Sequence, residues 1–221
     1  MMEVYHRPRE RGGREPHPKE EYAYILDYLP RGNPIDRHEP HRSKPVAQAL
    51  GDRFFTLLEL HPRPFMPVEI GERVYIGRGL RDKIAHVFGR IDYDDLTSVA
   101  RGNLPPTVSR IIQEKERFFV MFFNKAGAVT LKLHVLELLP GIGKKTLKIL
   151  LDERERRPFE SFEDVRVRGR IPDPVSILTE RIVAELRGEE KYYLFVRPPP
   201  HKPGIYLGFL EKLYEQMGGF D

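Results

Sequence analysis

An interrupted helical segment constrains the fold of this 221-residue chain more than any other feature of the sequence. An apolar run at residues 136–139 is followed by proline and then by Gly141, Ile142 and Gly143, before a helical pattern opens at Lys144. Glycine adopts positive φ and lets another molecule approach the backbone, so the two glycines suit a tight turn. The apolar residue between them is expected to enter the core. The segment therefore predicts a helical hairpin.

The start of the second helix is suited to hold an anion. The first N–H groups of a helix lack carbonyl partners and lie at the positive end of the helix dipole, which makes them a site for phosphate. The expected binding residues are Gly141, Ile142, Gly143, Lys144, Lys145, Thr146 and Lys148. Contact with phosphate carries no base information, so the site indicates nucleic acid without indicating which kind.

The segment resembles the helix-hairpin-helix motif, in which the amides of a Gly-apolar-Gly turn hold a nucleic-acid backbone. Residues 158–165, Pro-Phe-Glu-Ser-Phe-Glu-Asp-Val, are similar to the segment after the hairpin in that superfamily. A second turn at residues 171–174, Ile-Pro-Asp-Pro, lacks the glycine pair and has an acidic residue where phosphate would lie. We expect this second turn to be structural. The alternative for the first turn is a hairpin that only packs or contacts protein.

Composition limits the classes of protein. The 37 basic residues exceed the 33 acidic ones, and the pI near 9.2 permits a nucleic-acid partner. The absence of cysteine excludes disulfides, thiolate nucleophiles and cysteine-bound zinc. Apolar runs fall well short of the ~20 residues of a membrane helix, and residues 1–21 lack the apolar centre of a secretory signal. We therefore expect a cytoplasmic protein.

The first half of the chain is predicted to be a β part. Residues 1–20 are expected to form a flexible charged arm, and residues 21–127 a small barrel with a helical extension. The predicted strands lie at residues 21–29, 53–60, 68–76 and 83–91, the last with a bulge at Gly89. We favour an OB-like barrel, with an SH3-like barrel as the alternative. The candidates for stacking on bases are Tyr22, Tyr24 and Phe54 or Phe55, with burial in the core as the alternative.

A basic loop at residues 30–45 is a second candidate for binding nucleic acid. Its basic residues are Arg31, Arg37, Arg42 and Lys44. His38 and His41 could form half of a metal site, but no second pair lies at a suitable spacing. The acidic run at residues 92–95 is better explained as the first turn of a helix capped by Asp92 than as a metal site. We expect neither a metal nor a cofactor.

Helices are predicted for most of the second half. One helix runs from Asp92 toward Ala100, and a longer helix opens at Pro105 and Pro106 and stops at Gly127. The phenylalanines of residues 118–123 lie at helical spacing in the longer helix. They are expected to form the core that joins the β part to the hairpin.

Residues 128–188 are predicted to form a helix-hairpin-helix domain. Its helices are expected at residues 131–138 with Thr130 as cap, at residues 144–155, after Ser161 as cap, and at residues 174–186. Residues 189–221 are predicted to pack back on the β part through a strand at 191–196 and a helix at 205–217. The predicted fold class is α+β, a small OB-like β-barrel followed by a helical helix-hairpin-helix domain, with a C-terminal strand returning to the β part.

Further motifs resemble an archaeal family called domain of unknown function 655. They are Phe-Phe-Asn-Lys-Ala-Gly at residues 122–127, Leu-His at 133–134 and the hairpin segment at 136–145. The resemblance extends from residue 21 to about residue 196. It implies an OB-like part joined to a helix-hairpin-helix domain, with nucleic-acid binding and no established enzyme activity. Genes of that family tend to lie near those for an RNA polymerase subunit and an rRNA dimethyltransferase, which favours RNA.

The sequence thus predicts a non-enzymatic protein that binds structured or ribosomal RNA in ribosome biogenesis or translation. The ribosomal subunit or its assembly factors are the expected partners, and no membrane contact is expected. The alternatives are a DNA-binding repair or transcription factor, and a module that contacts protein through the hairpin. An enzyme, such as a nuclease or glycosylase, is disfavoured because no suitable nucleophile or metal-binding set is evident.

Overall fold

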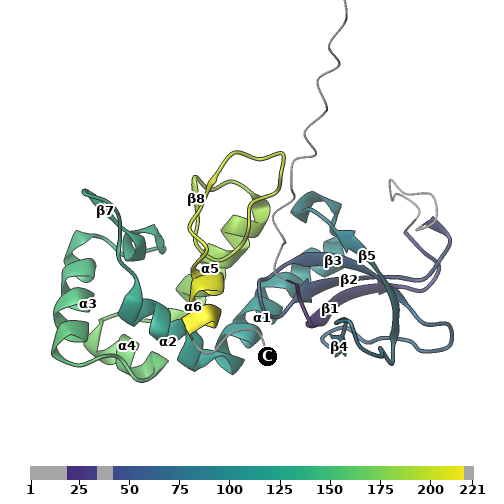
Figure 1. The fold of residues 1–221 in the computed structure, drawn as a ribbon, viewed down its shortest axis with the longest axis horizontal. Coiled ribbons are helices and arrows are strands. Elements are labelled where there is room, and N and C mark those ends of the chain that lie inside the picture. The colour runs from purple at the N-terminus through teal and green to yellow at the C-terminus, as the bar shows by residue number, and fades with distance from the viewer. Residues whose placement is uncertain (1–18, 34–41, 217–221) are drawn as a thin grey trace, which may run out of the picture.

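The computed structural model describes residues 19–33 and 42–216, and it joins a curled antiparallel sheet to a helical half (Figure 1). The sheet has five strands in the order β4-β1-β2-β3-β5 and forms a half-barrel with β4 and β5 at its edges. The strands are β1 (Tyr22–Leu29), β2 (Val46–Gly51), β3 (Leu57–Pro62), β4 (Arg73–Tyr75) and β5 (Ile84–Arg90). The class is therefore mixed α/β, as the sequence predicted in its broad outline.

The predicted strands agree with the sheet in part. The strands expected at residues 21–29 and 83–91 correspond to β1 and β5, and the bulge at Gly89 is confirmed by a shift in register against β3. The strand expected at 53–60 begins only at Leu57, because Phe55 adopts φ 54° in the turn after β2. The strand β2 was not predicted, because its two alanines and its glutamine give it a weak strand signal. Only three of residues 68–76 form a strand.

The helices next to the sheet differ from the prediction in where they begin. Asp92 precedes only the 3-10 turn η2 (Tyr93–Asp95), and α1 (Ser98–Glu114) begins after Thr97, whose hydroxyl accepts the N–H of Ala100 at 3.0 Å. The expectation that Pro105 and Pro106 open a helix is wrong, since both lie inside α1. Proline removes two helical N–H donors there. Both prolines are exposed, and α2 (Glu116–Lys125) follows after a break at Lys115.

The hairpin region contains less helix than the sequence predicted. The helix expected at residues 131–138 is absent. Two short strands, β6 (Ala128–Thr130) and β7 (Leu133–His134), lead instead into one 3-10 turn, η3 (Val135–Leu138). Thr130 therefore lies in a strand and caps no helix. Helix formation is delayed to residue 135, where the imidazole of His134 accepts the N–H of Leu136 at 3.1 Å.

The remaining helices of this half are confirmed. They are α3 (Lys144–Arg156), α4 (Phe162–Arg168) and α5 (Pro174–Arg187). Ser161 caps α4 as expected, because its hydroxyl accepts the N–H of Asp164 at 3.1 Å. The boundaries of these helices could be predicted because caps and glycine turns act within a few residues.

The C-terminal strand does not return to the five-stranded sheet. Instead β8 (Tyr192–Tyr193) pairs in parallel with β9 (Ile205–Tyr206). The following amides, of Leu194, Phe195 and Val196, donate to the buried carboxylate of Glu185 at 2.7–2.9 Å, so they are not available to a strand. The closing helix α6 (Phe209–Gln216) does reach the β part, since the Tyr214 and Phe54 ring centroids lie 5.5 Å apart.

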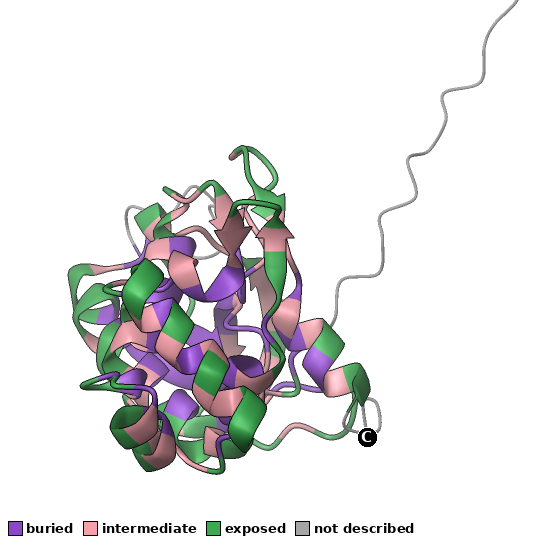
Figure 2. Cartoon of the chain, turned by 90° about the vertical axis from the view of Figure 1, so that its left-hand side faces the viewer, coloured by how far each residue is buried: buried purple, intermediate pink, exposed green. Residues whose placement is uncertain are grey.

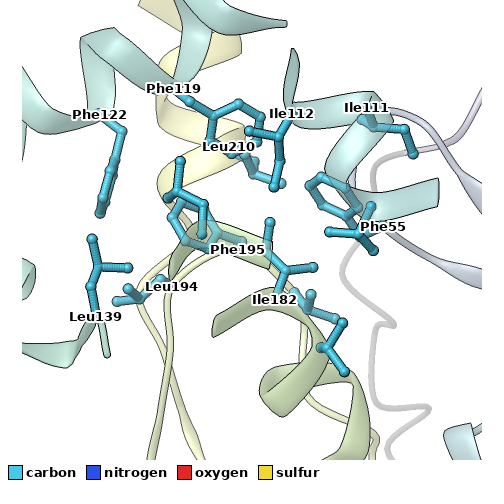
Figure 3. Packing of buried hydrophobic residues seen from close by; sticks show 14 of the residues in the cluster. Phe55, Ile111, Ile112, Phe119, Phe122, Leu139, Ile182, Leu194, Phe195 and Leu210 are labelled. Carbon is cyan, nitrogen blue, oxygen red and sulfur yellow. The ribbon is translucent and has the colours of Figure 1, made fainter. Parts of the chain in front are cut away.

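Of the two buried hydrophobic clusters in the described residues, one connects the sheet to the helices and the other lies on the sheet. Phe55, Ile111, Phe119, Ile182 and Phe195 belong to one buried cluster (Figure 3). The expected role of the phenylalanines at 118–123 is confirmed, because they share this cluster with Phe55 of the β part and Ile142 of the hairpin, and the Phe55 and Phe119 ring centroids lie 6.3 Å apart. Viewed from the α3 end, exposed positions line the outer faces of the helices (Figure 2). Within residues 19–33 and 42–216, no helix combines the length and apolar character needed to cross a membrane.

Candidate nucleic-acid interface

The turn before α3 has the geometry that its two glycines predict. Gly141 adopts φ 76°, a left-handed conformation, and the N–H of Ile142 donates to the carbonyl of Leu139 at 3.2 Å. Ile142 is only 5% exposed, so it anchors the turn in the core as expected. Gly143 is extended, with φ −91° and ψ −179°. A Cβ atom built on either glycine would meet no atom within 4 Å, so neither lacks a side chain for reasons of internal packing.

The N-terminus of α3 has no side-chain cap. Gly143 occupies the cap position without a side-chain hydrogen bond, and the first turn contains no acidic residue. The caps of the two following helices are occupied, since Ser161 accepts an N–H of α4 and Asp173 accepts the N–H of Ser176 at 2.9 Å. Basic residues in a first turn are unfavourable to a helix. The N–H groups of residues 144–146 thus lie at an exposed, positively charged end.

The three lysines predicted for this site differ in their surroundings. Lys144 Nζ lies 2.8 Å from Glu137 Oε1 and donates to the carbonyl of Lys132 at 3.0 Å. Lys145 and Lys148 are exposed and form no ion pair within the described part of the chain. They are three positions apart and therefore lie on one face of α3. Thr146 is half-buried. Two of the three charges remain available to a ligand.

Acidic groups lie beside the turn. A groove of about 560 Å³ is lined by the turn and by Glu137, Glu180, Arg181 and Glu190. The hydrogen bond from Lys144 and that from the backbone of His134 hold the pKa of Glu137 below its ordinary value. Arg181 is buried and donates to the carbonyl of Leu138 at 3.0 Å, which fixes the end of η3. The groove wall is thus less basic than the open end of α3.

The second turn, at residues 170–173, repeats the backbone pattern of the first, but the helix that follows it has a side-chain cap. Arg170 adopts φ 56° and is followed by Ile171, which is 3% exposed. The helix after it begins with the carboxylate of Asp173 bonded to its own first turn. That carboxylate occupies the place of an external anion. This cap agrees with the expectation of a structural turn, which rested on the acidic residue at the phosphate position.

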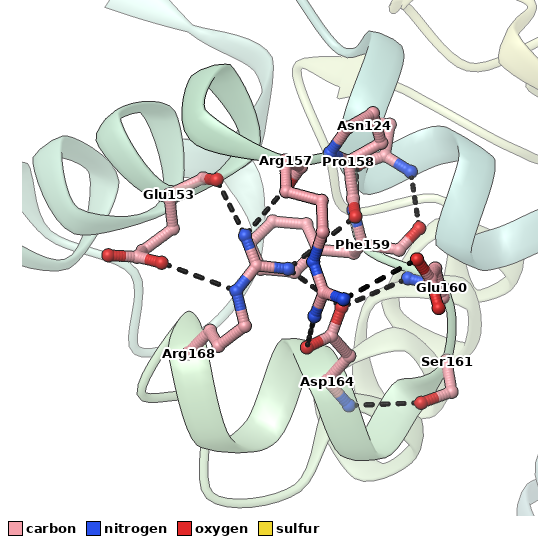
Figure 4. Close-up of polar contacts among 9 residues, drawn as sticks. All are labelled: Asn124, Glu153, Arg157, Pro158, Phe159, Glu160, Ser161, Asp164 and Arg168. Carbon is pink, nitrogen blue, oxygen red and sulfur yellow. Dashed lines mark hydrogen bonds and ion pairs between the residues drawn. The ribbon is translucent and has the colours of Figure 1, made fainter.

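The segment between α3 and α4 is held by a dense polar network (Figure 4). The Arg168 guanidinium lies 2.7 Å from Asp164 Oδ2 and donates to the backbone carbonyls of Glu153 and Arg157. Asn124 exchanges two hydrogen bonds of 2.8 Å with the backbone of Phe159. This network gives the polar residues of the segment a structural role. It also uses Arg168 internally, so Arg168 is not available to a nucleic-acid backbone.

The basic loop lies far from the α3 turn. The connection between β1 and β2 leaves the sheet at the opposite end of the long axis from α3 (Figure 1). Its described basic residues, Arg31, Arg42 and Lys44, are exposed. Arg37, His38 and His41 lie outside the described residues. The structure therefore does not bring the predicted binding residues into one site.

The aromatic candidates for base stacking are mostly core residues. Tyr24, Phe54 and Phe55 are at most 5% exposed, so they are not available to bases. The ring of Tyr22 is partly exposed, but the Arg73 guanidinium lies 3.7 Å from its centroid. Sequence alternation gives the period of a strand but cannot say which of its faces the helices cover.

A pocket between the sheet and the α1–α2 junction is lined by charged residues, some of which have a shifted pKa. It measures about 660 Å³, and Lys115 is one of the residues that line it. Burial lowers the pKa of Lys115, whose ammonium donates to the Tyr214 hydroxyl at 3.1 Å and to the backbone carbonyl of Asp52. The Asp52 carboxylate accepts from Arg73 at 2.8 Å. These groups bind one another and fix the β2–β3 turn to the helices.

The acidic run at residues 92–95 also serves the local fold. The side chain of Asp95 accepts the N–H of Asp92 at 3.0 Å, and the Asp92 side chain accepts an N–H in return. In the part of the chain that the structure describes, no three His, Cys, Asp or Glu residues are grouped in a way that could hold a metal ion.

Sequence and structure comparisons agree on the family. The family model described as protein of unknown function (DUF655) matches residues 19–197, and the chain belongs to this family. An uncharacterized protein of Methanocaldococcus jannaschii is 44% identical over 196 residues, which cover 87% of this chain and 86% of that protein. The crystal structure of a DUF655 protein from Archaeoglobus fulgidus is 43% identical and superposes with a TM-score of 0.73. The match covers 80% of this chain and all of that one.

Proposed function

We propose that this protein is a non-enzymatic nucleic-acid-binding protein, with RNA as the favoured ligand, and that the turn before α3 holds a backbone phosphate. The observation that carries the proposal is the exposed and uncapped N-terminus of α3 beside Gly143. Unpaired amides, the helix dipole and nearby ammonium groups all favour an anion at that end. Lys145 and Lys148 supply the mobile charge.

The paired turns support a relationship to the helix-hairpin-helix motif. In both turns a left-handed residue precedes a buried isoleucine, and a helix begins directly afterwards. The element before the first turn is the single 3-10 turn η3, where the helix-hairpin-helix motif has a full helix. The preference for RNA, and for a role in ribosome biogenesis or translation, comes from the family resemblance rather than from this geometry. The proposed cytoplasmic location comes from the composition of the chain.

The variant Gly143→Asp tests the proposal without a penalty to the fold. Aspartate is a favourable helix cap, the backbone at Gly143 suits any residue, and Asp173 already plays this part in α5. The added carboxylate would occupy the free amides and repel phosphate. We expect wild-type affinity for a structured RNA to fall with salt by about 0.7–0.9 log units per phosphate contact and per decade of salt. The variant should lose binding while its unfolding midpoint stays the same or rises.

The matched control is Gly102→Asp, which adds the same charge at an exposed site on α1 with no atom within 4 Å of the new Cβ. This variant should bind RNA as the wild type does. An affinity that is indifferent to salt, or an equal loss in both variants, would contradict the proposal. Tighter binding of duplex DNA of matched length would assign the site to DNA.

A second candidate function is a protein-interaction module. Two observations favour a ligand other than a bare phosphate chain. The wall of the groove is acidic, with Glu180 and Glu190, and Lys144 is paired with Glu137. A partner protein retained by Lys144→Glu plus Lys145→Glu, in a chain that binds neither RNA nor DNA, would favour this function.

A further inference from the structure

An aromatic surface lies on β3 and β5, at the end of the sheet far from α3. We define the sheet-end platform as the rings of His61, His86 and Phe88 on these strands, together with Phe65 on the loop that follows β3. The rings of His61 and His86 are nearly parallel, at 5°, with centroids 6.2 Å apart, and His61 and Phe88 stack at 5.5 Å and 26°. His86 is exposed, and His61 and Phe88 are partly exposed. Unlike Tyr24, Phe54 and Phe55, these rings are accessible.

Phe65 combines two unfavourable features. Its side chain is fully exposed, and its backbone adopts φ 62°, a left-handed conformation that disfavours a bulky side chain. The prolines at 62, 64 and 67 stiffen the loop that carries it. Within the described residues its ring contacts no other aromatic or cationic group. An exposed, strained aromatic residue without a packing role points to a ligand.

Basic groups surround the platform. His61 Nδ1 donates to the carbonyl of Pro45 at 2.7 Å, which places the end of the basic loop, with exposed Lys44, beside β3. The register brings Pro62 opposite Ile84, and Arg63 Nε donates to the Arg81 carbonyl at 3.0 Å. The guanidinium of Arg63 is exposed and pairs with no carboxylate in the described part of the chain. Accessible rings are thus interleaved with unneutralised cations.

This combination fits single-stranded nucleic acid. Aromatic faces stack on unpaired bases, while nearby cations neutralise the connecting phosphates. Paired bases in a duplex are already stacked and do not present their faces. We propose that the sheet-end platform binds single-stranded RNA by stacking unpaired bases on Phe65 and on the exposed His61, His86 and Phe88 rings. The choice of RNA rests on the proposed function, and the platform deepens it by naming the single-stranded form.

Photocrosslinking tests the location directly. The probe is an oligouridine of about 12 nucleotides, within the range bound by single-strand-binding domains, that carries 4-thiouridine and is irradiated with the full-length chain. We expect crosslinked peptides from residues 61–66 and 86–88. Unlabelled single-stranded RNA should compete, and the same length of duplex should compete poorly. Crosslinks confined to other segments, or equal competition by the duplex, would overturn the proposal.

Two variants test the mechanism. Phe65→Asn and His86→Ala should each weaken single-strand binding by about 5-fold or more, the loss typical of one stacked base. Asparagine tolerates left-handed backbone, so Phe65→Asn should leave the unfolding midpoint unchanged or raise it. The control Ile205→Asn removes a half-exposed apolar side chain on β9 and should bind as the wild type does.

The comparison with Gly143→Asp separates this proposal from the proposed function. Loss of binding in Gly143→Asp, with full binding in Phe65→Asn and His86→Ala, would overturn the platform and leave the α3 site in place. The opposite pattern would support the platform and overturn the α3 site. A wild-type chain that binds no RNA would overturn both.

Discussion

The ammonium of Lys144 lies 2.8 Å from a carboxylate oxygen of Glu137, across the turn that separates η3 from α3. The pair spans the two glycines and partly neutralises the first basic residue of the helix. Glu137 also accepts the N–H of His134 at 2.9 Å, so it is committed to the local fold. The neighbouring Lys145 has no such partner in the described part of the chain. Lys144 and Lys145 should therefore contribute differently to the binding of RNA.

Lys145→Gln should reduce the salt dependence of RNA binding more than Lys144→Gln does. Each free ammonium that neutralises a phosphate contributes about 0.7–0.9 to the slope of log affinity against log salt. We expect Lys145→Gln to remove about that much and Lys144→Gln to remove clearly less, because Glu137 already compensates Lys144. Fluorescence anisotropy titrations at several salt concentrations measure both slopes. Equal reductions in the two variants would show that Lys144 leaves Glu137 when RNA binds.

The two glycines of the turn should respond differently to alanine. Gly141→Ala should lower the free energy of unfolding by about 1–2 kcal/mol, because the left-handed conformation at φ 76° is strained for any residue with a Cβ atom. Gly143→Ala should change it by less than about 0.5 kcal/mol, since its backbone is extended and the space is open. Urea denaturation measures both. A large destabilisation by Gly143→Ala would contradict this prediction, because it would mean that the fold itself requires glycine at position 143.

The cap at His134 should make stability depend on pH. Burial, with the nearby Arg154 charge, lowers the pKa of His134 below its ordinary value of 6.5, and its neutral Nδ1 accepts the N–H of Leu136. A group whose folded pKa is depressed contributes fully above the unfolded pKa. That contribution is lost as the pH falls through the folded pKa. The wild type should therefore lose more stability than His134→Asn between about pH 7.5 and about pH 5.5, because asparagine caps without titrating.

Urea midpoints of the two proteins at both pH values give the comparison for His134. The outcome that would contradict the prediction is an identical pH dependence in the wild type and the variant. Hydrogen exchange at the Leu136 amide provides a local check, because opening of the cap exposes that N–H to solvent.

The buried pair of Arg181 and Glu185 should be a major contributor to stability. Arg181 Nε donates to Glu185 at 2.9 Å, and the same carboxylate accepts three backbone amides. Removing the Glu185 carboxylate leaves three buried amides without their acceptor and leaves Arg181 with Glu190 as its remaining carboxylate partner. Glu185→Ala should therefore lower the free energy of unfolding by about 3–5 kcal/mol. The control Glu163→Ala breaks an exposed pair with Arg166 and should leave the unfolding midpoint nearly unchanged. Similar midpoints for the two variants would contradict this assignment.

The elements predicted well from the sequence are those specified by adjacent residues. Ile142 between two glycines, the Ser161 cap and the Pro174 start of α5 each act within one helical turn. Errors arose where local signals were ambiguous. Pro105 and Pro106 usually open a helix but lie inside α1, and the residues before the α3 turn form two short strands and a 3-10 turn.

In the candidate sites, too, the residues predicted correctly are those specified by a local signal. The sequence alone identified the α3 turn and its lysines, because the glycine pair is a local signal. It did not identify the sheet-end platform, since the rings of His61, His86 and Phe88 come together only when β3 pairs with β5. It also assigned Tyr24, Phe54 and Phe55 as candidates for stacking, whereas α1, α2 and α6 cover them.

By itself the sequence determined the turn at residues 140–143, the helices that follow it and the basic character of their start, because backbone conformation and capping depend on nearby residues. Only the tertiary structure decided which aromatic rings are buried, where residues 194–196 go and which lysine is neutralised. Those outcomes depend on contacts between distant segments, such as the Glu185 carboxylate with the amides after β8. Burying a charged group is favourable only when the whole fold supplies its partners.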